Sequence, residues 1–233
     1  MPTPRNASDH HELKLRAAHR AMEFVKPGMT LGLGSGSTAS LWIQLLGEQV
    51  RDHGLDIRAI SSSDASETLA RSYGVQFTNF NECRRLDLAV DGADEVAPGL
   101  ALIKGGGGNL LREKIVAGAS DRFLIVADQS KVVDKLGRFP LPVEVIQMAE
   151  PLVSDSLKKF GFTPTRRRNP DGSPYITDEG NFILDCSGLL IDDPAQMSSQ
   201  LDSIIGVVEH GLFLHMASVA LIATSSGIVE RTG

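Results

Sequence analysis

Residues 91–113 read DGADEVAPGLALIKGGGGNLLRE, a stretch that combines clustered carboxylates, a lysine and four consecutive glycines. An apolar run at residues 86–90 leads into this stretch and predicts a buried strand. Asp91 and Asp94 therefore follow the carboxyl end of a strand, where parallel sheets bind their ligands. Lys104 and Glu113 bracket the glycine run on a flexible backbone. Acid, base and pliable backbone in one segment indicate proton-transfer chemistry on a small, oxygen-rich substrate.

The composition excludes several broad classes of protein. The 233 residues are 42% hydrophobic, which is enough for one large domain or two smaller ones. A net charge of -6 argues against a nucleic-acid partner, because nucleic-acid binders are usually basic. Two distant cysteines, Cys83 and Cys186, form no disulfide framework or zinc motif. No segment resembles a signal peptide or membrane span, so we expect a cytoplasmic protein with no membrane partner.

Strand-like and helix-like segments alternate through the first part of the chain, which predicts a parallel sheet covered by helices on both faces. The predicted strands are residues 29–33, 55–60, 75–77, 86–90 and 122–127. The predicted helices are residues 10–25, 64–73 and 109–119, with a further helix after residue 40. Asp64 and Asn109 are the expected N-caps of two of these helices.

The pattern changes near Gly137. Predicted strands follow at residues 142–146, 163–168, 175–177, 182–185 and 207–213, with helices at residues 150–160 and 194–204. If one strand pair is continuous, this order approximates the β-α-β-β-α-β motif of ferredoxin-like domains. Strands at residues 219–223 and 228–231 are expected to return to the first sheet. We therefore predict an α/β protein, with a Rossmann-like parallel-sheet domain (1–137 plus 214–233) and a smaller ferredoxin-like α+β domain (138–213).

The segment GLGSGSTAS, residues 32–40, joins a predicted strand to a predicted helix. Its glycines let backbone N–H groups face an anion, and the helix dipole favours negative charge there. The hydroxyl groups of Ser35, Ser37 and Thr38 suit a phosphate monoester. The segment is neither a Walker loop nor a regular dinucleotide fingerprint. A tight turn with a serine or threonine helix cap is the alternative interpretation.

Each charged candidate also has a structural alternative. Asp91 and Asp94 are interpreted as reactive carboxylates, but a solvated turn or a magnesium site stays open. Glu113 falls in the first helical turn, where a surface carboxylate also fits the dipole. Lys131 follows a strand and can reach an anion, or be an ordinary exposed lysine. The six histidines show no ligand spacing, so no metal is expected.

Two further features lie outside these motifs. Arg166, Arg167 and Arg168 form a basic run beside the turn-rich segment NPDGSP, and a solvated hairpin is the preferred interpretation, with a subunit contact as the alternative. His215 and Met216 are expected to pack near the junction of the two domains.

Six segments together resemble one family. GSGSTAS, SSSDAS, VDGADE, IKGGGGNLLREKI, ADQSK and LGRFPLPVEV occur in the order seen in ribose-5-phosphate isomerases of the A type. The resemblance implies interconversion of ribose 5-phosphate and ribulose 5-phosphate in the pentose phosphate pathway, without metal or organic cofactor. It further implies a homodimer, with a dimer of dimers as the alternative. The lengthened hairpin at residues 166–177 and His215 depart from the family pattern.

Carried over by motif, the family's catalytic glutamate corresponds to Glu113. The proton-handling and charge-stabilising roles are expected for Lys104, Asp91 and Asp94. The substrate-binding residues implied by the resemblance are Ser35, Gly36, Ser37, Thr38, Asp91, Gly92, Ala93, Asp94, Lys104, Gly105, Gly106, Gly107 and Lys131. Two other functions stay open: a sugar-phosphate-binding regulatory domain, and an amino-sugar-phosphate deaminase or CoA-transferase-like enzyme of the same broad fold.

Overall fold

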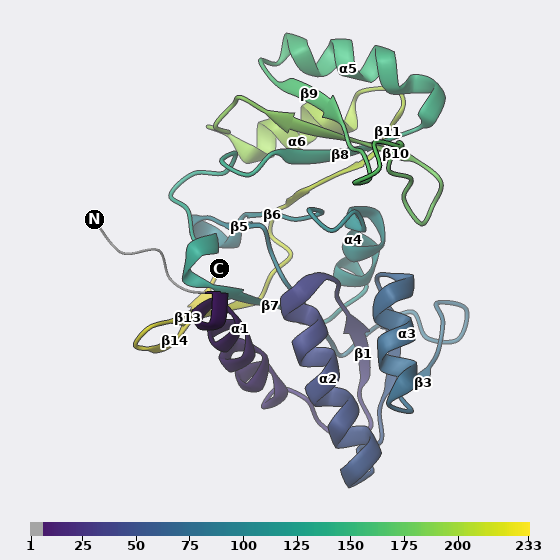
Figure 1. The fold of residues 1–233 in the computed structure, drawn as a ribbon, viewed down its shortest axis with the longest axis vertical. Helices are drawn as coiled ribbons and strands as arrows, with labels where there is room; N and C mark the ends of the chain where they lie inside the picture. Colours follow the sequence, from purple (N-terminus) through teal and green to yellow (C-terminus); the bar gives the residue numbers. More distant parts are fainter. Residues whose placement is uncertain (1–6) are drawn as a thin grey trace.

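The structure is a computed structural model, and it describes residues 7–233. A seven-stranded sheet forms the larger part, in the order β14-β13-β7-β4-β1-β2-β3 (Figure 1). All neighbours are parallel except the antiparallel pair β13 and β14. Its strands are β1 (Thr30–Leu33), β2 (Arg58–Ser61), β3 (Gln76–Phe77), β4 (Leu88–Asp91), β7 (Phe123–Asp128), β13 (Val219–Thr224) and β14 (Gly227–Thr232). The strand order 3-2-1-4-5-6 of Rossmann folds is present, which confirms the predicted class.

Helices pack on both faces of this sheet. One apolar cluster lies between the sheet and three helices, and includes the fully buried Trp42. A second cluster lies on the other face, where Val116 of the fourth helix meets Phe123 and Ile125. These helices are α1 (Ala7–Met22), α2 (Gly36–His53), α3 (Asp64–Ser72) and α4 (Leu110–Gly118). The cap of α3 is Ser63 rather than the predicted Asp64, because the Ser63 side chain accepts a hydrogen bond from Ser66 N.

A four-stranded antiparallel sheet forms the upper part of Figure 1, in the order β11-β8-β10-β9. Its elements are β8 (Leu141–Val145), α5 (Glu150–Lys159), β9 (Thr163–Arg166), β10 (Phe182–Ser187), α6 (Pro194–Asp202) and β11 (Val207–His210). In chain order they give β-α-β-β-α-β, which confirms the predicted ferredoxin-like motif. The exact limits of the two domains stay a prediction.

The predicted strand at residues 175–177 is wrong. Arg168 and Pro174 form only an isolated bridge, and the chain then leaves the sheet. Tyr175 N still donates to the Arg167 carbonyl, but Thr177 bonds through its side chain to the buried Glu144, so this segment is held by single contacts rather than by a strand ladder.

A small three-stranded sheet lies between the two parts and was not predicted. Its strands are β5 (Glu95–Val96), β6 (Leu102–Ile103) and β12 (Leu212–Phe213), in the order β12-β6-β5. The predicted strand 207–213 is therefore split between two sheets at Gly211. A Cβ at Gly211 would lie 2.4 Å from the Lys104 carbonyl oxygen, so only glycine fits there. Strands of two residues are too short to show a periodicity in the sequence.

The described part of the chain also contains three short 3₁₀ helices, namely η1 (Pro98–Leu100), η2 (Gln129–Lys131) and η3 (Gln147–Ala149). Within residues 7–233, every helix is too short or too polar to cross a bilayer.

Candidate active site

A cavity of about 110 Å³ lies where strands β1, β4 and β7 end. The residues predicted from sequence that line it are Ser35, Gly36, Ser37, Thr38, Gly92, Ala93, Asp94, Lys104, Gly105, Gly106, Gly107, Glu113 and Lys131. Asp91 lies behind the wall, where it contacts Lys104. Residues from distant parts of the chain thus meet at one edge of the parallel sheet, as the strand order requires.

Lys104, Asp91 and Glu113 form a buried lysine cluster. The ammonium of Lys104 lies 2.8 Å from Asp91 Oδ2 and 3.4 Å from Glu113 Oε2, and it donates to the Gly92 carbonyl at 2.6 Å. All three charged side chains are at most 4% exposed. One lysine therefore forms ion pairs with two carboxylates. Its ammonium occupies the position beside Asp91 that a magnesium ion would need.

Ser35 fixes the two carboxylates of this cluster. Its backbone N–H donates to Asp91 Oδ1 at 3.0 Å, and its hydroxyl donates to Glu113 Oε1 at 2.5 Å. Ser35 occupies the N-cap position of α2 but makes no side-chain cap bond, because its hydroxyl is directed to Glu113. The second carboxylate oxygen of Glu113 is buried and makes no hydrogen bond within residues 7–233. Glu113 is thus hydrogen-bonded through Oε1, while Oε2 lies in the ion pair with Lys104.

Burial changes the protonation of this cluster. Desolvation raises the pKa of Asp91 to about 7, against the lowering influence of Lys104 and with a further rise from Glu113. Burial alone would lower the pKa of Lys104, but the charges of Asp91 and Glu113 outweigh it and raise that pKa. Lys104 therefore stays positively charged at neutral pH, while Asp91 is poised to share a proton.

Asp94 is anchored to the glycine loop, residues 105–108. The N–H of Gly106 donates to Asp94 Oδ2 at 2.7 Å. A Cβ at Gly106 would lie 2.6 Å from Asp94 Oδ1, so this close approach requires glycine. Burial raises the pKa of Asp94, although the Gly106 bond lowers it. A partly desolvated carboxyl group that faces the cavity can act as a proton donor and acceptor.

The opposite part of the cavity is suited to an anion. It contains the start of α2, whose first N–H groups have no partner within the helix and whose first turn holds no acidic residue. Lys131 of η2 lines this part as predicted. Lys14 of α1 also lines it, and its ammonium donates to Ser37 Oγ at 2.9 Å. Sequence reasoning missed Lys14, because one lysine on an amphipathic helix gives no signal of its own.

The interpretation of the basic run as a solvated hairpin is wrong for Arg167, whereas Arg168 is exposed on a hairpin as expected. The guanidinium of Arg167 pairs with Asp185 and donates to the carbonyls of Gly105 and Gly106, at 2.9 and 3.2 Å. The side chain of Arg167 is only 13% exposed. It therefore braces the glycine loop from the four-stranded sheet. Any subunit contact by Arg166 or Arg168 stays a prediction.

His215 is exposed and lies at a positive φ of 55°. It therefore does not pack at the domain junction as expected, whereas Met216 is partly buried against the core around Phe213.

One group of potential metal ligands lies outside the cavity. Within residues 7–233, Asp202, Glu209 and His210 place ligand atoms within 4.8 Å of one another, a grouping that histidine spacing did not predict. However, the Lys114 ammonium already lies 2.6 Å from Glu209, and His210 Nδ1 accepts a hydrogen bond from Leu212 N. Repulsion from Lys114 opposes a metal ion at this position, and the group is accounted for as an ion-pair cluster.

Comparison with known proteins gives a consistent result. The family model for ribose 5-phosphate isomerase A (phosphoriboisomerase A) matches residues 58–227. A relative named ribose-5-phosphate isomerase A, from Nitrobacter hamburgensis, is 48% identical over 227 residues, which cover 94% of this chain and 97% of the relative.

Solved structures give the same relationship. The structure of ribose 5-phosphate isomerase A from Methanocaldococcus jannaschii superposes with a TM-score of 0.92 at 39% identity, covering 96% of this chain and all of that one. A D-ribose-5-phosphate isomerase in complex with phospho-erythronic acid also gives a TM-score of 0.92, at 36% identity, covering 95% of this chain and 98% of that one. The matches span nearly the full length at high identity, and the chain therefore belongs to the ribose 5-phosphate isomerase A family.

Proposed function

We propose that this protein interconverts D-ribose 5-phosphate and D-ribulose 5-phosphate through an enediol or enediolate, with Glu113 as the base. The observation that supports this proposal most directly is that one cavity contains both an anion cradle and an oriented, buried carboxylate. The cradle is the start of α2 with Lys14 and Lys131, and the carboxylate is Glu113.

Isomerisation moves one proton between C2 and C1 of the open-chain sugar. Glu113 removes the proton from C2 of the aldose and returns it to C1, so a single carboxylate performs both transfers. The Ser35 hydroxyl orients Glu113 by donating to Oε1. Oε2, which lies beside Lys104, is then the oxygen that takes the substrate proton. Phosphate bound at the cradle fixes the reacting carbons from a remote position.

Negative charge that develops on the substrate oxygen during this transfer needs a stabilising partner. Lys104 provides a buried ammonium, and the glycine-loop N–H groups other than those of Gly106 and Gly108 provide further donors. Asp91 keeps Lys104 charged and in place. This charge arrangement supplies what proton transfer requires, so the proposed reaction uses no metal or organic cofactor.

The sugar phosphate is mainly a closed ring in solution, and ring opening requires a separate proton shuttle. Asp94 is the proposed group, because it faces the cavity and its pKa is raised by burial. Asp91 lies behind Lys104, where its ion pair raises the pKa of that lysine and holds its ammonium in position.

The ligand of one relative is informative about the same chemistry. Phospho-erythronic acid combines a phosphate with a carboxylate. A planar carboxylate resembles an enediolate in shape and charge, so we expect this compound to bind here as an analogue of the intermediate. It is a suitable probe of binding for variants that do not turn over.

We also propose a homodimer, with a homotetramer as the alternative, and a cytoplasmic location. Support for self-association comes from large apolar side chains that are exposed on the four-stranded part of the molecule. They include Met148 and Leu152, 89% and 72% exposed, and Ile205, 95% exposed. Light scattering coupled to size exclusion would measure the assembly, and a monomer at micromolar concentration would contradict it.

The direct test supplies ribose 5-phosphate to the purified protein and follows ribulose 5-phosphate by NMR in deuterated water. We expect turnover that persists in EDTA, with solvent deuterium appearing in the product because the base exchanges its proton. Failure to isomerise would refute the proposal. Ammonia release from an amino-sugar phosphate would favour a deaminase, and binding without turnover would favour a regulatory domain.

A further inference from the structure

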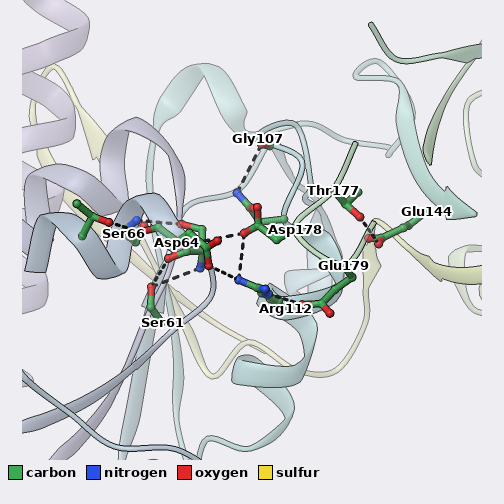
Figure 2. A network of polar contacts seen from close by, with 12 residues as sticks. Ser61, Asp64, Ser66, Gly107, Arg112, Glu144, Thr177, Asp178 and Glu179 are labelled. Carbon is green, nitrogen blue, oxygen red and sulfur yellow. Dashed lines mark hydrogen bonds and ion pairs between the residues drawn. The ribbon is translucent and has the colours of Figure 1, made fainter. Parts of the chain in front are cut away.

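Arg112, the residue before the proposed base, is surrounded by carboxylates. Its guanidinium lies 2.6 Å from Asp64 and 3.1 Å from Asp178 through Nη1, and Nε lies 2.5 Å from Glu179 (Figure 2). We call these four residues the arginine network. Three carboxylates around one guanidinium exceed what charge neutralisation requires.

The three carboxylates come from two separate parts of the fold. Asp64 is the first residue of α3, which packs on the parallel sheet. Asp178 and Glu179 lie on the turn between β9 and β10 of the four-stranded sheet, and Asp178 Oδ2 also accepts a bond from Asp64 N at 3.4 Å. The arginine network is therefore a direct polar link between the two parts of the molecule.

The turn that holds Asp178 and Glu179 is itself anchored in the small sheet. Glu144 of β8 is 1% exposed and accepts a hydrogen bond from Thr177 Oγ1 at 2.9 Å (Figure 2). It accepts another from Asn181 Nδ2 at 3.0 Å. Asn181 N donates in turn to Thr177 Oγ1. A buried carboxylate thus fixes both ends of the turn, so the turn can act as a rigid support.

The start of α4 needs such a support. It follows the glycine loop, and its N-cap residue Asn109 makes no side-chain cap bond. Successive helical residues point about 100° apart, from 3.6 residues per turn. Arg112 accordingly points out of the cavity while Glu113, 4% exposed, points into it. A shift of this helical turn moves both side chains together.

We propose that Arg112 is a positioning residue that fixes the first turn of α4, and thereby the carboxylate of Glu113, against the turn at residues 177–181. This inference rests on the proposed function of Glu113 as the base. Without the guanidinium, the three carboxylates repel one another, so the α3 start and the 177–181 turn separate and release α4. The small domain then contributes to catalysis without touching the substrate.

The test compares Arg112→Ala, Arg112→Lys and Asp178→Ala with Arg71→Ala, which removes an exposed ion pair on α3. We expect Arg112→Ala to lower kcat about 10- to 100-fold, the cost of misplacing a catalytic group by about 1 Å. KM should stay near the wild-type value, because Arg112 lies outside the anion cradle. Arg112→Lys should restore part of kcat, and Arg71→Ala should leave kcat unchanged.

A double variant identifies the partner through which Arg112 acts. If Arg112 works through the turn, Arg112→Ala combined with Asp178→Ala should lower kcat less than the product of the single effects. Additive effects, or a change confined to KM, would overturn the proposal, as would an Arg112→Ala variant with wild-type kcat.

Amide hydrogen exchange separates this inference from the proposed function. The amides of residues 113–116, the first in α4 that have partners within the helix, should exchange faster in Arg112→Ala than in wild type, in the absence of any substrate. If wild type failed to isomerise ribose 5-phosphate, the proposed function would fall, and exchange would still decide whether Arg112 holds α4. Unchanged exchange in Arg112→Ala would refute the positioning role directly.

Discussion

Two consecutive residues of α4, Arg112 and Glu113, belong to two charged clusters that differ in burial. In the buried lysine cluster, the side chains of Lys104 and Glu113 are 2% and 4% exposed. In the arginine network, the side chains of Arg112 and Asp64 are 29% and 78% exposed. Both clusters contain more carboxylates than cations, so composition alone does not distinguish them.

The difference in burial indicates which of the two clusters can shift pKa values enough to support proton transfer. In a low-dielectric site, charges interact strongly and shift the protonation of their neighbours, as the raised pKa of Asp91 illustrates. At the surface, water screens the attraction within each ion pair. The main contribution of such a pair is to fix the relative positions of the segments it joins. We therefore assign proton transfer to the buried lysine cluster and positioning to the arginine network.

The largest effect is expected for Glu113→Gln, which removes the proposed base and keeps its shape. An amide cannot accept the C2 proton, so kcat should fall by about 10²–10⁴-fold. Binding of phospho-erythronic acid, measured by calorimetry, should persist because the anion cradle is intact. The matched control is Glu67→Gln, an exposed glutamate paired with Arg71. Equal kcat for the two variants would contradict the assignment of proton transfer to the buried lysine cluster.

Lys104→Met should reduce both catalysis and stability. Loss of a donor to developing negative charge lowers kcat by about 10²–10³-fold. Two carboxylates are then left buried without their cation, which lowers the free energy of unfolding by about 3–5 kcal/mol. Urea unfolding measures the second effect. The exposed Lys135, paired with Asp192, gives the control Lys135→Met, for which neither effect is expected.

The pH dependence of stability tests the raised pKa of Asp91. Its carboxyl group titrates near 3.8 when unfolded and near 7 when folded, so the folded state binds more protons between these values. The free energy of unfolding contributed by this group therefore decreases as pH rises through that window. Asp91→Asn lacks this contribution.

Urea unfolding of wild type and Asp91→Asn at several pH values measures the contribution of Asp91 to the free energy of unfolding. The stability of wild type relative to the variant should decline from pH 3.8 towards about 7 and then level off. A relative stability that rises over this range would mean that Lys104 stabilises Asp91 as a carboxylate more than burial destabilises it.

The smallest effect is expected for the stability of Glu67→Gln. The Glu67–Arg71 pair is exposed and spaced i,i+4, so its loss should cost about 0.3–0.5 kcal/mol. The difference should disappear at 1 M salt, where the Debye length is about 3 Å. A loss comparable to that of Lys104→Met would show that exposed pairs stabilise this fold as strongly as buried ones.

Local patterns predicted much of the candidate site. Asp91 and Lys104 were singled out because they adjoin a buried strand and a run of glycines, and Ser35 because it follows the first strand. Glu113 was assigned through the family resemblance, since its position alone also fits a surface carboxylate. The residues missed or misinterpreted make long-range contacts. Lys14 meets Ser37, and Arg167 meets Gly105, 62 residues away.

The amino-acid sequence by itself determined the order of strands and helices in the two larger sheets, the family and the residues that cluster at the sheet edge, because periodicity, glycines and local motifs are properties of neighbouring residues. Only the tertiary structure decided which charges are buried. Arg112 and Glu113 are adjacent in sequence, yet one meets Asp178 at the surface and the other meets Lys104 inside. The physical reason is that desolvation depends on all the segments that pack around a group, most of which are distant along the chain.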